Sequence, residues 1–97
     1  MDPYEELLAF YPEIIDQMPN RFNSHEFILK LAHQHQGPYV RVLAHYSDSD
    51  TPFAIVHGRL AKLLAERFSH LVRYVGDEPS RDIFGHVNEV ALWIKVT

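Results

Sequence analysis

Residues 51–76 read TPFAIVHGRLAKLLAERFSHLVRYVG and contain the strongest periodic signal in the chain. Thr51 and Pro52 are a typical helix start, with a capping residue before a proline at the first helical position. Apolar residues then recur every three or four positions, as in an amphipathic helix; they are Phe53, Val56, Leu60, Leu63, Leu64 and Phe68. After Ser69 the period changes to two. The stretch therefore predicts a long helix followed by a strand over 71–75.

The segments on either side of this stretch predict two more helices and one more strand. Asn23 and Glu26 have the spacing of a capping box, so a helix is expected to begin there and to end near Gly37. A second helix is expected over 38–46. The last strand is expected over 90–96, and the connection between the strands over 76–89. In that strand the core face is predicted to carry Val90, Leu92, Ile94 and Val96, with Ala91, Trp93 and Lys95 opposite.

Residues 1–20 differ in composition from the rest of the chain. They contain five acidic residues and no basic one, a net charge of −5, whereas residues 21–97 sum to +1. Apolar residues at helical spacing predict an amphipathic helix, which Pro12 is expected to kink or restart; they include Tyr4, Leu7, Leu8, Tyr11, Ile15 and Met18. We therefore expect an acidic helical appendage over 1–20 and one domain over 21–97.

The predicted order from residue 23 is helix, helix, helix, strand, long loop, strand. This α+β order resembles the winged-helix version of the helix-turn-helix, in which a three-helix core carries a two-stranded hairpin. The resemblance covers about 23–97 and includes no residue motif. It implies a recognition helix over Thr51–Phe68, a wing over Gly76–Glu89 and, through the extra N-terminal helix, a homodimer.

Composition argues against several classes of protein. The chain lacks cysteine, which rules out a disulfide framework and thiolate chemistry. It has no apolar run of membrane-spanning length, and its acidic start is unlike a secretory signal. The seven histidines include no pair at the spacing of a helical metal site. We therefore expect a cytoplasmic protein with no membrane segment, metal, cofactor, small-molecule ligand or enzymatic activity.

Basic residues around the long helix suggest that the protein binds double-stranded DNA as a regulatory factor. Arg59 and Lys62 would meet the duplex, because they lie three apart and away from the apolar stripe. Supporting phosphate contacts are expected from Arg41, Arg67, Arg73 and Arg81. Acidic residues at both flanks, such as Asp50 and Asp82, would repel phosphate. The alternative is therefore that these bases form only the solvated side of an amphipathic helix.

Exposed aromatic residues suggest a second function, protein–protein interaction or dimerisation. Trp and Tyr are favoured anchors at interfaces, and the expected contact residues are Tyr4, Leu8, Tyr11 and Trp93. Two further details bear on the architecture. Gly58 would allow a close approach to the long helix, and Ile83 and Phe84 indicate that the loop between the strands is partly held in place. A catalytic or metal-dependent activity built on the histidines is the third alternative.

Overall fold

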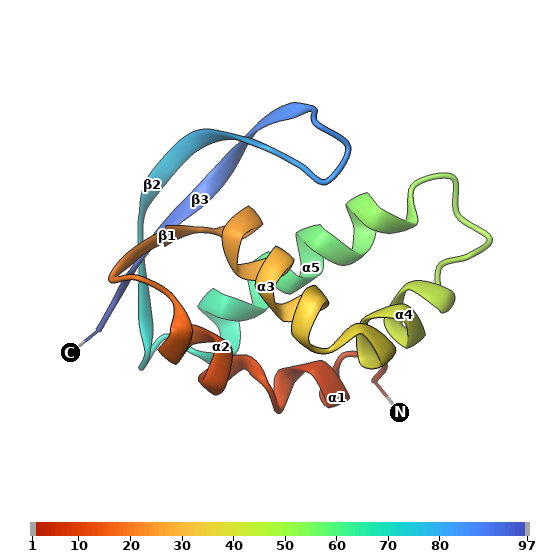
Figure 1. Ribbon diagram of the computed structural model, residues 1–97, viewed down its shortest axis with the longest axis horizontal. Helices are drawn as coiled ribbons and strands as arrows, with labels where there is room; N and C mark the ends of the chain where they lie inside the picture. Colours follow the sequence, from red (N-terminus) through yellow and green to blue (C-terminus); the bar gives the residue numbers. More distant parts are fainter. Residues whose placement is uncertain (1, 97) are drawn as a thin grey trace.

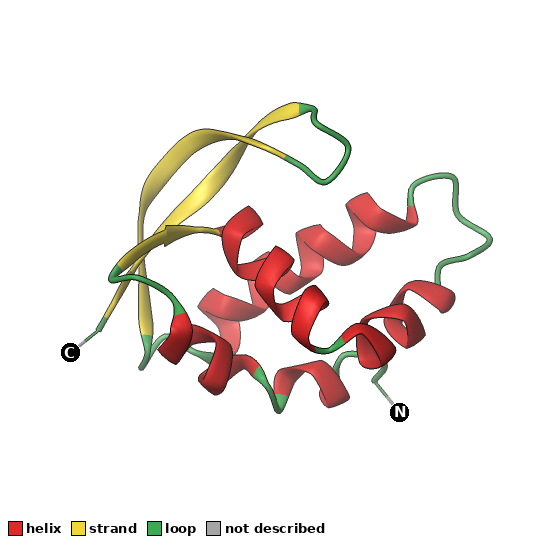
Figure 2. Cartoon of the chain, viewed as in Figure 1, coloured by secondary structure: helices red, strands yellow, loops and turns green. Residues whose placement is uncertain are grey.

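The computed structural model describes residues 2–96, which form five helices and one three-stranded antiparallel sheet. Figure 2 shows the strands at one end of the molecule and the helices beside them. The α+β class expected from the sequence is confirmed, whereas the sheet has three strands and not two. The elements are α1 (Glu5–Leu8), α2 (Tyr11–Gln17), β1 (Arg21–Asn23), α3 (Ser24–Gln34), α4 (Gln36–Ala44), α5 (Pro52–Arg67), β2 (Val72–Arg81) and β3 (Val87–Lys95).

The starts of α3 and α5 agree with the sequence signals, whereas α4 begins at Gln36, before the expected start at 38, and contains Gly37. The Asn23 side chain accepts from the Glu26 backbone N–H at 2.9 Å, and the Glu26 carboxylate accepts from the Asn23 N–H at 2.8 Å. This is the predicted capping box. Thr51 precedes α5, with Pro52 at the first helical position, although the Thr51 side chain makes no capping hydrogen bond. A new helix, α2, begins at Tyr11 after α1 ends, with Pro12 in its first turn.

The sheet differs most from the prediction. Its strand order is β1-β3-β2, and the residues between β2 and β3 are only 82–86, so the expected loop over 76–89 is wrong. Gly76 and Pro79 belong to the residues expected in that loop, but they lie inside β2. Gly76 has a φ of 138° at a bulge in the strand pairing. Pro79 pairs with Glu89 in the register, at a position where a proline's missing N–H removes no bond. Strand β1 was missed because three residues are too few for a period.

The core faces of β3 also differ from the prediction. Trp93, expected on the outer face, is only 3% exposed and belongs to the main core cluster, while Val96 is exposed. The indole N–H of Trp93 donates to the Ser24 hydroxyl at 2.9 Å. Leu92 on the other face is buried too, beside Asn23 of β1, whose side chain reaches across to Glu78 of β2 at 2.8 Å. Side chains on both faces of β3 are therefore buried, so its burial does not follow the simple alternation.

The N-terminal segment is part of the core and not an appendage. Figure 1 shows α1 and α2 running along the helical layer, beneath α3, α4 and α5. Their apolar side chains join a single core cluster with those of the later helices and the sheet. The seven that do so are Tyr4, Leu7, Leu8, Tyr11, Ile14, Ile15 and Met18. The expected boundary at residue 20 therefore does not separate two independent packing units.

Candidate functional site

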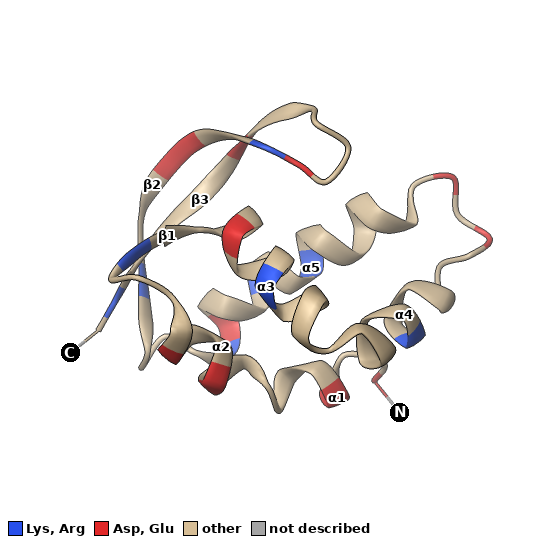
Figure 3. Ribbon diagram, viewed as in Figure 1, with Lys and Arg blue, Asp and Glu red and all other residues tan. Residues whose placement is uncertain are grey.

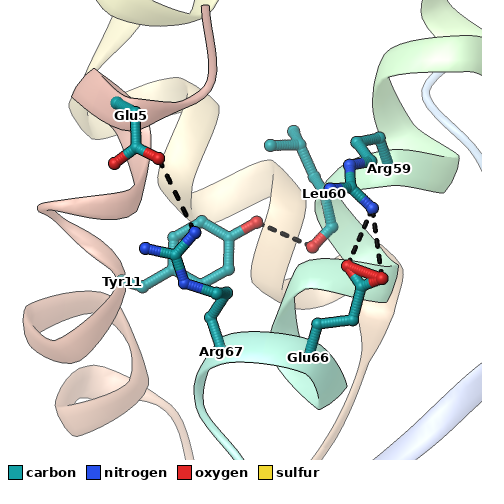
Figure 4. A network of polar contacts seen from close by, with 6 residues as sticks. All are labelled: Glu5, Tyr11, Arg59, Leu60, Glu66 and Arg67. Atoms are coloured by element: carbon teal, nitrogen blue, oxygen red, sulfur yellow. Dashed lines mark hydrogen bonds and ion pairs between the residues drawn. The ribbon is translucent and has the colours of Figure 1, made fainter. Parts of the chain in front are cut away.

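The six basic residues expected to contact DNA belong to α4, α5 and β2. Figure 3 shows that Lys and Arg are spread over several elements, with Asp and Glu among them. Three of the six bind carboxylates of the same chain. Arg41 donates to Glu6 at 3.0 and 2.8 Å, and these bonds hold the pKa of the Glu6 carboxyl below its usual range. Figure 4 shows the other two pairs, Arg59 with Glu66 at 2.7 Å and Arg67 with Glu5 at 3.6 Å.

The other three bases do not complete one surface. Lys62 is exposed on α5, facing the β2–β3 hairpin. Arg73 lies in β2, level with Ile94 of β3. Arg81 donates to the Gly85 carbonyl at 2.8 Å and so bridges the hairpin loop. The structure therefore does not bring the six bases together as a single basic face.

The residues expected to bind a partner are all buried within the chain. Tyr4, Leu8, Tyr11 and Trp93 are each at most 5% exposed. The Tyr11 hydroxyl donates to the Leu60 carbonyl at 2.7 Å (Figure 4), and burial raises the pKa of this phenol. These side chains hold α1, α2 and β3 to the rest of the core. They are not available as interface anchors, and the homodimer expected through this segment stays a prediction.

A groove opens instead between α5, the start of α3 and the β2–β3 hairpin, and it encloses about 790 Å³. Figure 1 shows the hairpin curving over so that its tip approaches the beginning of α5. There Phe84 packs edge-on against Phe53, with ring centroids 5.2 Å apart. The α5 side of the groove includes three small residues at helical spacing, Ala54, Gly58 and Ala61, beside larger ones such as Phe53 and His57. The size of the three small residues keeps the space between helix and hairpin open.

The groove is mainly apolar with a polar rim. Its lining includes Ile28, Ile83, Phe84 and Val90, and its acidic groups are Asp50, Asp82 and Glu89 against the single base Lys62. Asp82 organises the hairpin loop by accepting the N–H groups of Phe84 and His86, both at 2.9 Å. These bonds, together with the nearby His86 ring, hold the pKa of the Asp82 carboxyl below its usual range despite desolvation.

Two histidines line the groove on the helical side. The Tyr39 hydroxyl lies 2.6 Å from His57 Nε2, a contact in which a neutral imidazole can accept the hydroxyl hydrogen. Burial lowers the pKa of His57, nearby His25 lowers it further, and Asp82 opposes both. The Nδ1 atom of His25 is buried without a hydrogen-bond partner among residues 2–96. Within the same residues no group of three or more His, Asp or Glu is arranged to hold a metal ion.

We expect His57 to make the protein less stable in mild acid. The pKa of His57 is lowered in the folded state, so the unfolded chain takes up a proton first as pH falls below about 6.5. The free energy of unfolding should therefore decline from pH 7 to pH 5, and less steeply in His57→Asn. Urea unfolding at several pH values measures these slopes. Replacement of the exposed His45 with Asn is the control, and equal slopes for all three proteins would contradict the expectation.

Comparison of the chain with protein-family models, curated proteins and solved structures finds no match. The functional interpretation of the groove therefore depends on the residues and contacts described above. Within residues 2–96, no helix combines the length and apolar character that crossing a membrane requires.

The groove was not predicted from the sequence, although three of its residues were singled out there. Gly58 was interpreted as allowing a close approach to the long helix, and Ile83 and Phe84 as holding the loop in place. In the structure all three line the groove. Their meeting could not be predicted, because residues 76–89 were expected as a long loop, and the sequence does not show where such a loop lies. The long β2 and β3 bring the hairpin tip to the start of α5.

Proposed function

We propose that this protein is a protein-interaction module that holds a segment of a partner protein in the groove. The observation that carries the proposal is the groove itself, an open and mainly apolar space of about 790 Å³ between α5, the start of α3 and the β2–β3 hairpin. Concave, mostly apolar sites with a few polar groups are the usual form of binding sites. Phe84 and Ile83 at the hairpin tip are 60% and 48% exposed, so they offer apolar surface to a ligand.

DNA binding is less well supported by the arrangement of charge. Three of the six basic residues expected to contact DNA form ion pairs with carboxylates of the chain, and the hairpin tip carries Asp82. A duplex would need those ion pairs to open, and it would meet acidic groups at the groove rim. Both DNA binding and the winged-helix resemblance stay predictions.

Gly58 offers a direct test. A Cβ added at Gly58 would meet nothing within 4 Å, so a longer side chain can start there without a clash, and Gly58→Leu should extend into the groove. The change should also favour the helix by about 1 kcal/mol, because glycine is a poor helix former. Peptides of twelve random residues are selected on the immobilised full chain, synthesised and titrated into labelled protein by NMR. We expect amide shifts around Gly58 and Val90, and at least tenfold weaker binding to Gly58→Leu.

Ala65→Leu is the matched control, because Ala65 is an exposed α5 residue outside the groove lining. It should bind as the unmodified chain does. A 20-base-pair duplex at low salt forms the parallel arm. The proposal is overturned if no peptide is selected, if peptides bind Gly58→Leu unchanged, or if only the duplex shifts the spectrum.

A further inference from the structure

The edge of β3 that faces the groove is only partly covered by β1. Strand β1 pairs with β3 at three positions, from Arg21 opposite Ile94 to Asn23 opposite Leu92. After Asn23 the chain turns into α3, so among residues 2–96 no strand lies beside the rest of β3 on this side. The uncovered stretch, 87–91, is about 15 Å long at roughly 3.3 Å per residue. Its residues Asn88–Ala91 line the groove.

The direction of the main-chain groups along this edge follows from the register. Pro79 has no N–H, so its pair with Glu89 must be one in which the main-chain groups of both residues point away from each other. Glu89 therefore turns its N–H and C=O away from β2, and alternation gives Val87 and Ala91 the same direction. Two bonds on this side agree. The Lys95 N–H donates to the Asn20 carbonyl at 2.9 Å, and the Ser24 hydroxyl donates to the Ala91 carbonyl at 3.4 Å.

Val87 and Glu89 consequently direct two N–H and two C=O groups toward the open side of the sheet. None of these four groups has a hydrogen-bond partner among the residues that the structure describes. An uncovered strand edge of this kind is a template for pairing with another chain. Proteins that bind extended peptides use such edges, because main-chain bonds supply affinity and pockets for alternate side chains supply specificity.

We infer that the groove takes an extended peptide segment, which adds as a strand to the free edge of β3 in line with β1. The inference rests on the proposed function and names its ligand class. The added strand would bond to Val87 and Glu89. Every second side chain would point toward the small residues of α5, where Ala54, Gly58 and Ala61 leave room for apolar groups.

The charge of the groove favours a basic segment. Its lining carries three carboxylates and one lysine, a formal charge of −2 with neutral histidines. Asp50 and Glu89 are exposed, so a Lys or Arg in the segment can reach either without burying its charge. We therefore expect the selected peptides to alternate apolar residues and to contain Lys or Arg.

Backbone methylation of the peptide separates strand addition from other ways of filling the groove. The tightest selected peptide is synthesised with one N-methyl group, placed in turn at each residue of its central stretch. The side chains stay unchanged, so only main-chain donation and close pairing are lost. We expect at least tenfold weaker binding at alternate positions and little change between them. Amide exchange at Val87 and Glu89 should slow when the unmodified peptide is bound.

A protein variant makes the complementary test. Glu89→Pro removes one N–H from the free edge and leaves the β2–β3 bonds intact, because Glu89 does not bond to β2. It should weaken binding at least tenfold, whereas Glu89→Ala, which keeps the N–H, should cost no more than about threefold. Thermal unfolding verifies that both variants fold. If Glu89→Pro does not fold, the methylated peptides still test the inference on the unmodified chain.

The outcomes distinguish this inference from the proposed function. Binding that Gly58→Leu abolishes, with an alternating effect of methylation, supports both. A different result is that Gly58→Leu abolishes binding while methylation has no effect at any position or the same effect at every position. This result would overturn strand addition and leave the proposed interaction module unaffected. Failure to obtain any peptide that binds the groove overturns the proposed function and this inference with it.

Discussion

Removal of residues 1–19 will abolish cooperative folding of the remaining chain. The segment supplies seven of the eighteen side chains in the core cluster. Burial of each contributes about 1.5–3 kcal/mol, so their loss removes on the order of 10–20 kcal/mol. This meets or exceeds the total stability of a typical domain, about 5–15 kcal/mol. Circular dichroism during urea titration should show no sigmoidal transition, and the amide spectrum should lose its dispersion.

A milder change in the same segment is the control. Glu13 and Asp16 are exposed on α2, so replacing both with glutamine removes charge but no core contact. The transition should shift only slightly, because surface contacts such as that of the exposed Glu13 carboxylate with His35, at 2.6 Å, contribute about 0–1 kcal/mol. A truncated chain with a sharp unfolding transition would instead show that residues 1–19 are a dispensable appendage.

Replacement of Trp93 with alanine should destabilise the fold by about 3–5 kcal/mol, the range for deleting a buried aromatic side chain. Trp93 is 3% exposed and packs edge-on against Tyr74, with ring centroids 5.9 Å apart. Its indole N–H also bonds to Ser24. Trp93→Phe should lower the free energy of unfolding by less, because it keeps most of the apolar volume and loses mainly this hydrogen bond. Urea unfolding monitored by circular dichroism measures both changes.

Val96 provides the comparison for Trp93. It follows β3 and is 47% exposed, so Val96→Ala should change the free energy of unfolding by about 0.5 kcal/mol or less. Similar small effects for Trp93→Ala and Val96→Ala would mean that the indole lies at the surface, where it could serve as an interface anchor as the sequence suggested.

Features that depend on residues close together in the chain could be predicted from the sequence. The apolar stripe of α5 and the Asn23–Glu26 capping box involve residues three or four apart, and both appear in the structure as expected. These interactions are local, because one turn of a helix brings residues three or four apart together without help from the rest of the chain. The α+β class followed from the change of period after Ser69.

Features that depend on residues far apart in the chain could not be predicted from the sequence, because they arise only in the tertiary structure. Gly76 and Pro79 are turn formers by local preference, yet pairing with β3 holds them in a strand. Trp93 is buried with its indole N–H donating to the hydroxyl of Ser24, 69 residues away, and Tyr11 is buried with its hydroxyl donating to the carbonyl of Leu60. The groove likewise forms where α3, α5 and the hairpin tip meet. No local pattern encodes such meetings, because their free energy comes from burying surfaces that only the folded chain brings together.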